Sequence, residues 1–135
     1  MNFISLIFAE ISKLLYFLFL VNSIVNYGLL YSLSNQGSDK IRGIMLHSPR
    51  RVKVPLHAQA FRKMTNLKIL IVNNLHICEA IQYFPNGIRL LSWPKYPFPL
   101  PSNYCPQQLV SLHMPYSRIE LEKLCKQVQL LIFFN

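Results

Sequence analysis

The sequence predicts an α/β fold in which short strands alternate with return segments in a series of similar units. A pattern of apolar residues, L-x-x-L-x-L, recurs after residue 35, and the steps between successive copies are equal except for a longer first step. Such a pattern with a period of about 20 to 29 residues is typical of leucine-rich repeats. We therefore expect a short leucine-rich-repeat solenoid of about four to five repeats, preceded by an N-terminal hydrophobic helix. The copies are Ile41/Ile44/Leu46, Leu67/Leu70/Val72, Ile88/Leu91/Trp93, Leu109/Leu112/Met114 and Leu130/Phe133/Asn135.

The composition also favours many short elements. Of the 135 residues, 52% are apolar, which is enough for one domain with a buried core. Nine prolines against four glycines favour short strands joined by rigid corners over long helices. Because the composition changes near residue 35, we expect an apolar segment at 1–35 and a leucine-rich-repeat region at 36–135.

The N-terminal segment has the hydropathy of a membrane span. Residues 14–34 carry no charge, and a run of this length crosses a bilayer core of roughly 30 Å. A cleaved signal peptide fits less well, because no Lys or Arg precedes the first apolar residues, Glu10 interrupts them, and Val21-Asn22-Ser23 is only a loose cleavage site. If the segment inserts, the basic excess after Asp39 keeps the repeat region in the cytosol. The alternatives are a buried helix, or a gene-model remnant that does not belong to the working protein.

Two return segments carry helical patterns. After Pro55, four apolar residues fall on one helical face. Further along, Ser117 and Glu120 have the spacing of a capping box, and the apolar residues after them recur at i, i+3, i+4 and i+7. The proline-rich stretch at 85–106 is expected to form tight turns. The two apolar faces consist of Leu56, Ala60, Phe61 and Met64, and of Leu121, Leu124, Cys125 and Val128.

Four strings of the sequence resemble one protein family. In chain order they are GSDKIRGIMLHSP, HAQAFRKMTNLKILIV, FPNGIRLLSWPKYP and PLPSNYCPQQLVSLHMPYSRIE. They are similar to the start of the repeat region in TIR-NBS-LRR disease resistance proteins. These are plant intracellular immune receptors with a TIR domain, a nucleotide-binding domain and leucine-rich repeats. The resemblance runs from Gly37 to Lys126. Where the family has its nucleotide-binding domain, this sequence has the apolar segment, and QLLIFFN stands where the family continues with further repeats.

Motifs of enzymes and cofactor sites are missing from the sequence. Glycines stand only at positions 28, 37, 43 and 87, so no G-x-x-x-x-G-K-[ST] loop can cradle a phosphate. The four histidines form no H-E-x-x-H, and no G-x-S-x-G is present. Glu120 and Glu122 do not face each other on a helix. We expect no catalytic residue, no cofactor, no metal and no small-molecule substrate, and hence a protein that is not an enzyme.

The cysteines indicate a reducing compartment. Cys78, Cys105 and Cys125 are odd in number, form no C-x-x-C, and lack histidines at the spacing of a tetrahedral metal site. We therefore expect buried free thiols. No Asn-x-Ser/Thr sequon occurs in the sequence, which argues against a secreted protein.

Two sets of residues are candidates for binding a partner, and a solvated surface is the alternative for each. Residues between the inward positions should face the concave surface of the solenoid, which is commonly a binding surface. They are Met45, His47, Ile71, Asn73, Ser92, Lys95, His113 and Tyr116. Between Lys40 and Lys68 there are eight Lys or Arg residues and no acid, so this region should attract an acidic surface. The basic candidates are Arg50, Arg51, Lys53, Arg62, Lys63 and Lys68. Trp93, at an inward position, is expected in the core.

The resemblance implies a protein-recognition module in plant defence, acting in pathogen perception or autoinhibition. Its partner would be the nucleotide-binding domain of an immune receptor, or a pathogen effector. We expect a cytoplasmic protein, with residues 14–34 as a membrane anchor if they insert. One alternative is a membrane-anchored or secreted receptor-like repeat protein. The other is a basic nucleic-acid-binding module, which no zinc finger, RRM signature or aromatic series supports.

Overall fold

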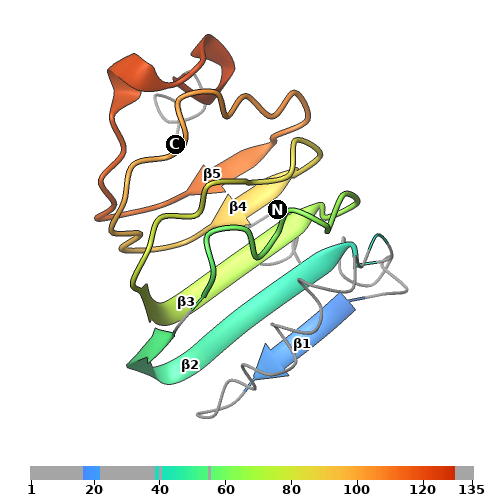
Figure 1. Ribbon diagram of the computed structural model, residues 1–135, viewed down its shortest axis with the longest axis vertical. Helices are drawn as coiled ribbons and strands as arrows, with labels where there is room; N and C mark the ends of the chain where they lie inside the picture. The colour runs from blue at the N-terminus through green and yellow to red at the C-terminus, as the bar shows by residue number, and fades with distance from the viewer. Residues whose placement is uncertain (1–16, 22–38, 40, 55, 130–135) are drawn as a thin grey trace, which may run out of the picture.

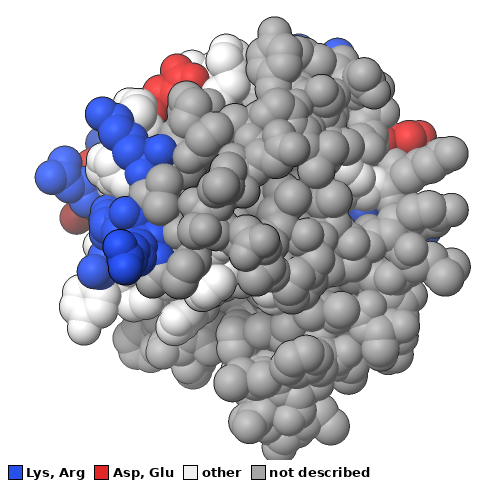
Figure 2. Space-filling model, turned by 90° about the horizontal axis from the view of Figure 1, so that it is seen from below, with Lys and Arg blue, Asp and Glu red and all other residues white. Residues whose placement is uncertain are grey.

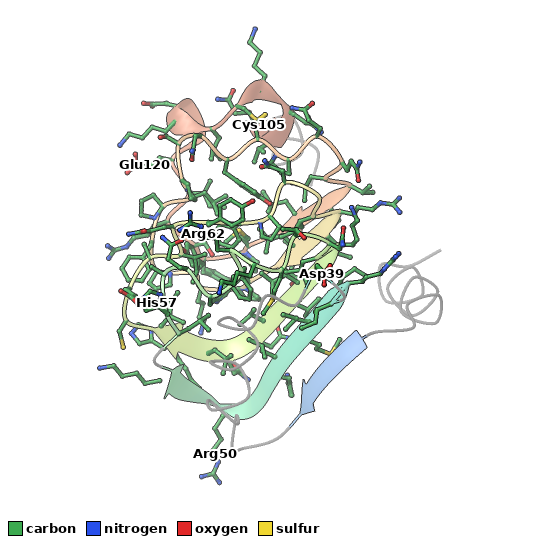
Figure 3. The ribbon with its side chains drawn as sticks, turned by 45° about the vertical axis from the view of Figure 1, so that its right-hand side comes forward. Asp39, Arg50, His57, Arg62, Cys105 and Glu120 are labelled. Carbon is green, nitrogen blue, oxygen red and sulfur yellow. A yellow bond between two sulfur atoms is a disulfide. The ribbon has the colours of Figure 1, made fainter. Side chains whose placement is uncertain are left out.

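Five parallel strands form the framework of the structure, a computed structural model that describes residues 17–21, 39, 41–54 and 56–129. The strands pair in chain order, each with the next. Figure 1 shows them stacked from β1 to β5, and in Figure 3 the connecting segments lie on one face of the sheet. A parallel sheet with little helix agrees with the predicted α/β class. The elements are β1 Phe17–Val21, β2 Gly43–Val54, β3 Ile69–Ile77, β4 Leu90–Ser92, β5 Ser111–His113 and the 3-10 helix η1 Leu121–Lys123.

The repeated apolar positions build the core between the sheet and the connecting segments. In register, Ile44 pairs with Leu70, Leu70 with Leu91, and Leu91 with Leu112. Burying one such side chain contributes roughly 1.5 to 3 kcal/mol. The inward positions are therefore confirmed for four copies, whereas Leu130/Phe133/Asn135 lies outside the described residues. All residues at the apolar positions of the pattern in these four copies are buried: Ile41, Ile44, Leu46, Leu67, Leu70, Val72, Ile88, Leu91, Trp93, Leu109, Leu112 and Met114.

An aromatic cluster continues the core around β4. Trp93 is fully buried, as predicted, and stands edge-on to Tyr96 with ring centroids 5.0 Å apart. The ring of Phe84 lies 6.5 Å from Trp93 and 5.3 Å from Tyr104. The backbone N–H of Ile81 donates to the Tyr96 hydroxyl at 2.9 Å. These large rings fill the space beside a proline-rich stretch that forms no helix.

The helix expected after Pro55 is absent, and consecutive turns replace it. The N–H of Ala60 donates to the carbonyl of His57 at 2.9 Å, and the N–H of Met64 to that of Phe61 at 3.1 Å, so these bonds span three residues. The segment must run back along the nine residues of β3, roughly 30 Å at about 3.3 Å per residue. About fourteen residues of α-helix would cover only about 21 Å, so more extended turns are required. The predicted apolar face is nevertheless buried: Leu56, Ala60, Phe61 and Met64.

The second expected helix forms only in part. The 3-10 helix η1 covers Leu121–Lys123, and a helical turn follows at 126–129. Leu124 and Val128 are buried in the core, as the pattern predicted. In the proline-rich stretch, turns at 86–87, 94–95 and 102–103 agree with the expectation of tight turns.

A strand stands at Phe17–Val21, where we expected part of a hydrophobic helix. It pairs in parallel with β2, Leu18 opposite Ile44. Aromatic and aliphatic residues suit a strand, and β2 offers an edge of unpaired backbone groups, so pairing overrides the helical expectation here. The step along the sequence from Leu18 to Ile44 equals the step from Ile44 to Leu70. The rest of 1–35, including most of the span predicted at 14–34, lies outside the described residues, and the boundary at residue 35 stays a prediction.

Candidate partner-binding surfaces

Four of the predicted concave residues form one row across the sheet. Met45 pairs with Ile71, Ile71 with Ser92, and Ser92 with His113. Because side chains alternate along a strand, this row faces away from the core row that begins with Ile44. Ile71 and Ser92 are only 5% and 6% exposed, whereas Met45 is partly exposed and His113 is exposed. The row therefore offers Met45 and His113 to a partner, and the role of these residues stays a prediction.

Lys95 and Tyr116 occupy equivalent turns after β4 and β5. They are one repeat period apart, and Asn74 holds the same place one copy earlier. All three have left-handed backbones, with φ of 60° at Asn74 and Lys95 and 57° at Tyr116. This conformation costs a residue with a side chain about 1 to 2 kcal/mol. Tyr116 is 89% exposed, so a large aromatic side chain stands in solvent on a strained turn, as is common in binding surfaces.

Ser117 fixes the geometry of these turns. Its Oγ accepts a hydrogen bond from the N–H of Tyr96 at 2.9 Å and donates one to the carbonyl of Trp93 at 3.3 Å. The N–H of Lys95 donates to the carbonyl of Pro115 at 2.8 Å. The turn after β5 is therefore bonded to the turn after β4, and Tyr116 is presented by a supported backbone.

β2 carries a bulge next to His47. His47 pairs with Asn73 but Val52 pairs with Leu75, so β2 takes five steps where β3 takes two. The extra length of β2 turns the chain outward, and Figure 3 shows Arg50 pointing away from the sheet. Bulges commonly redirect side chains beside functional sites. The longer first step between copies, from Ile41 to Leu67, was the only sign of this insertion in the sequence.

Three basic candidates gather at this bulge: Arg50, Arg51 and Lys53, which we call the basic bulge. All three are exposed. The Arg51 Nη2 atom lies 3.3 Å from Nδ1 of His76, and because a guanidinium only donates, Nδ1 is the acceptor. Figure 2 shows Lys and Arg side chains gathered on the side toward which β2 and β3 point in Figure 1. This side of the molecule therefore presents a positive surface suited to an acidic partner.

The other basic candidates lie apart from the bulge. Arg62 and Lys63 are exposed on the turns of the return segment. Lys68 stands at the start of β3, where its N–H donates to the carbonyl of Arg42 at 2.7 Å and its carbonyl accepts from the N–H of Arg89 at 2.8 Å. The structure thus divides the predicted basic face into separate groups. Arg42 and Arg89 were not among the predicted basic candidates. Each directly follows the first apolar residue of its copy, as Lys68 does.

The expectation of three buried free thiols was wrong. Cys105 and Cys125 form a disulfide with Cα atoms 5.7 Å apart, and Cys78 is free and exposed. The separation of the two bonded residues along the sequence is close to one repeat period, so consecutive return segments bring them side by side. That near-match of spacing and period was the signal available in the sequence.

Within the described ranges, no group of three or more His, Cys, Asp or Glu side chains could hold a metal ion. In those same ranges, no helix has the length and hydropathy needed to cross a bilayer.

Known proteins with similar sequences include disease resistance proteins of Arabidopsis thaliana. Disease resistance-like protein DSC1 is 36% identical over 97 residues, covering 62% of this chain and 8% of DSC1. Disease resistance protein RRS1 is 35% identical over 95 residues, covering 63% of this chain and 7% of RRS1. Disease resistance protein RPS6 is 33% identical over 97 residues, with coverages of 64% and 9%.

The chain spans less than a tenth of the length of these relatives. No protein-family model matches it. No solved structure matches it either. Three relatives at 33 to 36% identity nevertheless bear out the resemblance carried by the four strings. Over about 63% of its length, the chain is thus similar to plant disease resistance proteins of the TIR-NBS-LRR class.

Proposed function

We propose that the chain is a protein-recognition module of a plant innate immune receptor, built as a short leucine-rich-repeat solenoid. One observation carries the proposal: equivalent positions of successive copies, such as Ile44, Leu70, Leu91 and Leu112, lie side by side in a parallel sheet. Stacked repeats of this kind commonly bind proteins on their exposed sheet face. The module acts by binding rather than by catalysis, in pathogen perception or in autoinhibition, and works in the cytoplasm.

Two surfaces support contact with a partner. The basic bulge suits an acidic surface of a nucleotide-binding domain, in a longer version of this protein or in a partner receptor. The other candidate surface is the exposed sheet face, with Met45 at one end of its row and His113 and Tyr116 at the other, and we assign a pathogen effector to it. The Cys105–Cys125 disulfide is the observation behind the alternative of a membrane-anchored or secreted receptor-like protein, because such bonds persist mainly in oxidising compartments. The exposed basic bulge is the observation behind the alternative of a nucleic-acid-binding module.

Charge reversal of the bulge tests the docking proposal. Changing Arg50→Glu, Arg51→Glu and Lys53→Glu together should weaken co-precipitation with a separately expressed nucleotide-binding domain of a related disease resistance protein. Exposed charges mainly set the association rate and its salt dependence, whereas breaking a desolvated pair costs about 2 to 5 kcal/mol. We expect at least a roughly tenfold loss of affinity at low salt, and a smaller loss at high salt.

The matched control reverses three exposed basic residues beyond β5, with Arg118→Glu, Lys123→Glu and Lys126→Glu, so that the net charge changes equally. This variant and His47→Ala should lose much less affinity. An equal loss in the matched control would show that net charge alone matters. Unchanged affinity of the bulge variant, with its fold intact by circular dichroism, would remove the docking proposal.

A further inference from the structure

We infer that Cys105 and Cys125 form a reversible thiol–disulfide modification site, which takes small disulfides of the glutathione type as its oxidant. The site fastens the return segment after β5 to the return segment before it. This inference does not depend on the proposed function, because it concerns how one end of the sheet is held together.

The position of the two residues makes the bond a link between neighbouring copies. Cys105 lies between β4 and β5, and Cys125 lies beyond β5. Figure 3 shows Cys105 at the β5 end of the stack, beside the chain that follows η1. Both residues are partly exposed, so small thiols and disulfides have access to this part of the surface.

Besides the disulfide, few contacts hold the return segment after β5 in place. Leu124 and Val128 insert into the core, and the side-chain Nε2 of Gln127 donates to the carbonyl of Gln107 at 2.9 Å. In the described part of the sheet β5 is the last strand, so this segment packs against the preceding copy only. Opening the disulfide therefore leaves the apolar side chains of Leu124, Val128 and the partly buried Ile119, with few polar contacts to the preceding copy, to hold the segment. Segments with so few contacts open locally at low cost.

The local charge favours exchange at Cys125. Lys126 follows it directly and is exposed, whereas Lys123 is paired with Glu120. A cation near a thiol favours the thiolate, which is the attacking form. The inferred exchange therefore begins at Cys125, which has an exposed lysine next to it in the sequence.

The protein disulfide forms in two steps of thiol–disulfide exchange. The thiolate of Cys125 attacks one sulfur of the small disulfide, a mixed disulfide forms, and one small thiolate leaves. The thiolate of Cys105 then attacks the Cys125 sulfur and expels the second small thiolate. Two protein thiols are oxidised to one disulfide, one small disulfide is reduced to two thiols, and the two protons pass to the products. An excess of the small thiol reverses both steps.

Redox titration of the full chain tests the inference. The protein is equilibrated in glutathione buffers from fully reduced to fully oxidised, free thiols are alkylated, and each cysteine is quantified by mass spectrometry. We expect Cys105 and Cys125 to change together in one transition within this range, while Cys78 stays outside the pair. Closing a loop of about 20 residues should raise the midpoint of thermal unfolding by roughly 10 °C in the oxidised protein.

Limited proteolysis reports on the segment itself. Trypsin should cut after Lys123 and Lys126 about tenfold faster in the reduced protein, because the segment opens more often. Cys105→Ser and Cys125→Ser should abolish both redox effects, and Cys78→Ser should retain them. The comparison of the wild-type protein in two buffers needs no substitution, so it decides even if a serine variant does not fold. Thiols that stay unpaired in oxidised buffer, a bond that survives every reducing buffer, or equal proteolysis in both states would overturn the inference.

Discussion

Tyr96 and Tyr104 belong to one aromatic cluster but differ in how their hydroxyl groups are satisfied. The Tyr96 hydroxyl accepts a hydrogen bond from the N–H of Ile81. Among the described residues the Tyr104 hydroxyl has no hydrogen-bond partner, and neither has Nε1 of Trp93. Burial raises the pKa of Tyr96 to about 12, opposed by the bond from Ile81. Burial also raises the pKa of Tyr104. Both tyrosines are therefore kept neutral in the folded state.

We expect the free energy of unfolding to fall as the pH rises above about 10. A tyrosine in the unfolded chain loses its proton near pH 10, whereas folded Tyr96 keeps it up to a pKa of about 12. Between these values the unfolded state binds fewer protons than the folded state, so stability decreases with pH. Each such group lowers stability by at most about 1.4 kcal/mol per pH unit in this window. Urea unfolding at several pH values between 8 and 11 measures the slope.

Tyr104→Phe separates the contribution of one hydroxyl. The variant should show a shallower fall above pH 10 than the wild type. At pH 7 it should be within about 0.5 kcal/mol of the wild type or slightly more stable, because it removes a buried group without a partner. Tyr116→Phe, at an exposed position, is the control and should leave the slope unchanged. A stability that stays constant up to pH 11 would contradict the role given to burial.

At the scale of elements, the turns after the strands decide how the copies are joined. Asn74 within β3 and the turns at Lys95 and Tyr116 share a left-handed backbone, and Ser117 bonds the turn after β5 to the turn after β4. Asparagine tolerates this conformation better than lysine or tyrosine. The strain is thus greater at Lys95 and Tyr116 than at Asn74.

Replacing Lys95 by glycine should stabilise the protein. Glycine adopts a positive φ without steric cost, and the gain is partly offset by its greater freedom in the unfolded chain. We expect about 0.5 to 1 kcal/mol of added stability from denaturant unfolding. Lys95→Ala removes the same side chain but keeps the steric cost, so it should give no such gain. Equal stabilities of the two variants would show that the backbone at residue 95 is not strained.

At the scale of the whole molecule, stability depends on neighbouring copies covering one another. Each copy has too little apolar surface to fold alone and packs only against the copies beside it. β1 covers one edge of β2, which at 12 residues is the longest strand described. An uncovered strand of that length pairs readily with other chains.

Deleting residues 1–35 should therefore reduce solubility. Without β1, the edge of β2 is exposed to pairing with other chains. We expect residues 36–135 to self-associate under conditions in which the full chain associates less, as measured by size-exclusion chromatography with light scattering. A monodisperse monomer of 36–135 that melts cooperatively would contradict this view of the edge.

The spacing of apolar residues determined by itself where β2 to β5 lie, which of their residues point into the core, and that Trp93 is in the core. It did so because a strand buries alternate residues, and a constant period places equivalent residues beside each other. The same residues also carried the resemblance to disease resistance proteins. The return segments were predictable in their buried faces but not in their backbone, because the helical pattern does not reveal how far the chain must reach.

Only the tertiary structure decided the bulge of β2, the pairing of β1, the Cys105–Cys125 bond, the burial of Ile71 and Ser92, and the separation of the basic residues into groups. Each of these depends on contacts between residues that lie about one repeat period or more apart in the sequence. Local sequence preferences are too weak to select such contacts, because pairing and packing across the sheet outweigh the preference of any single residue.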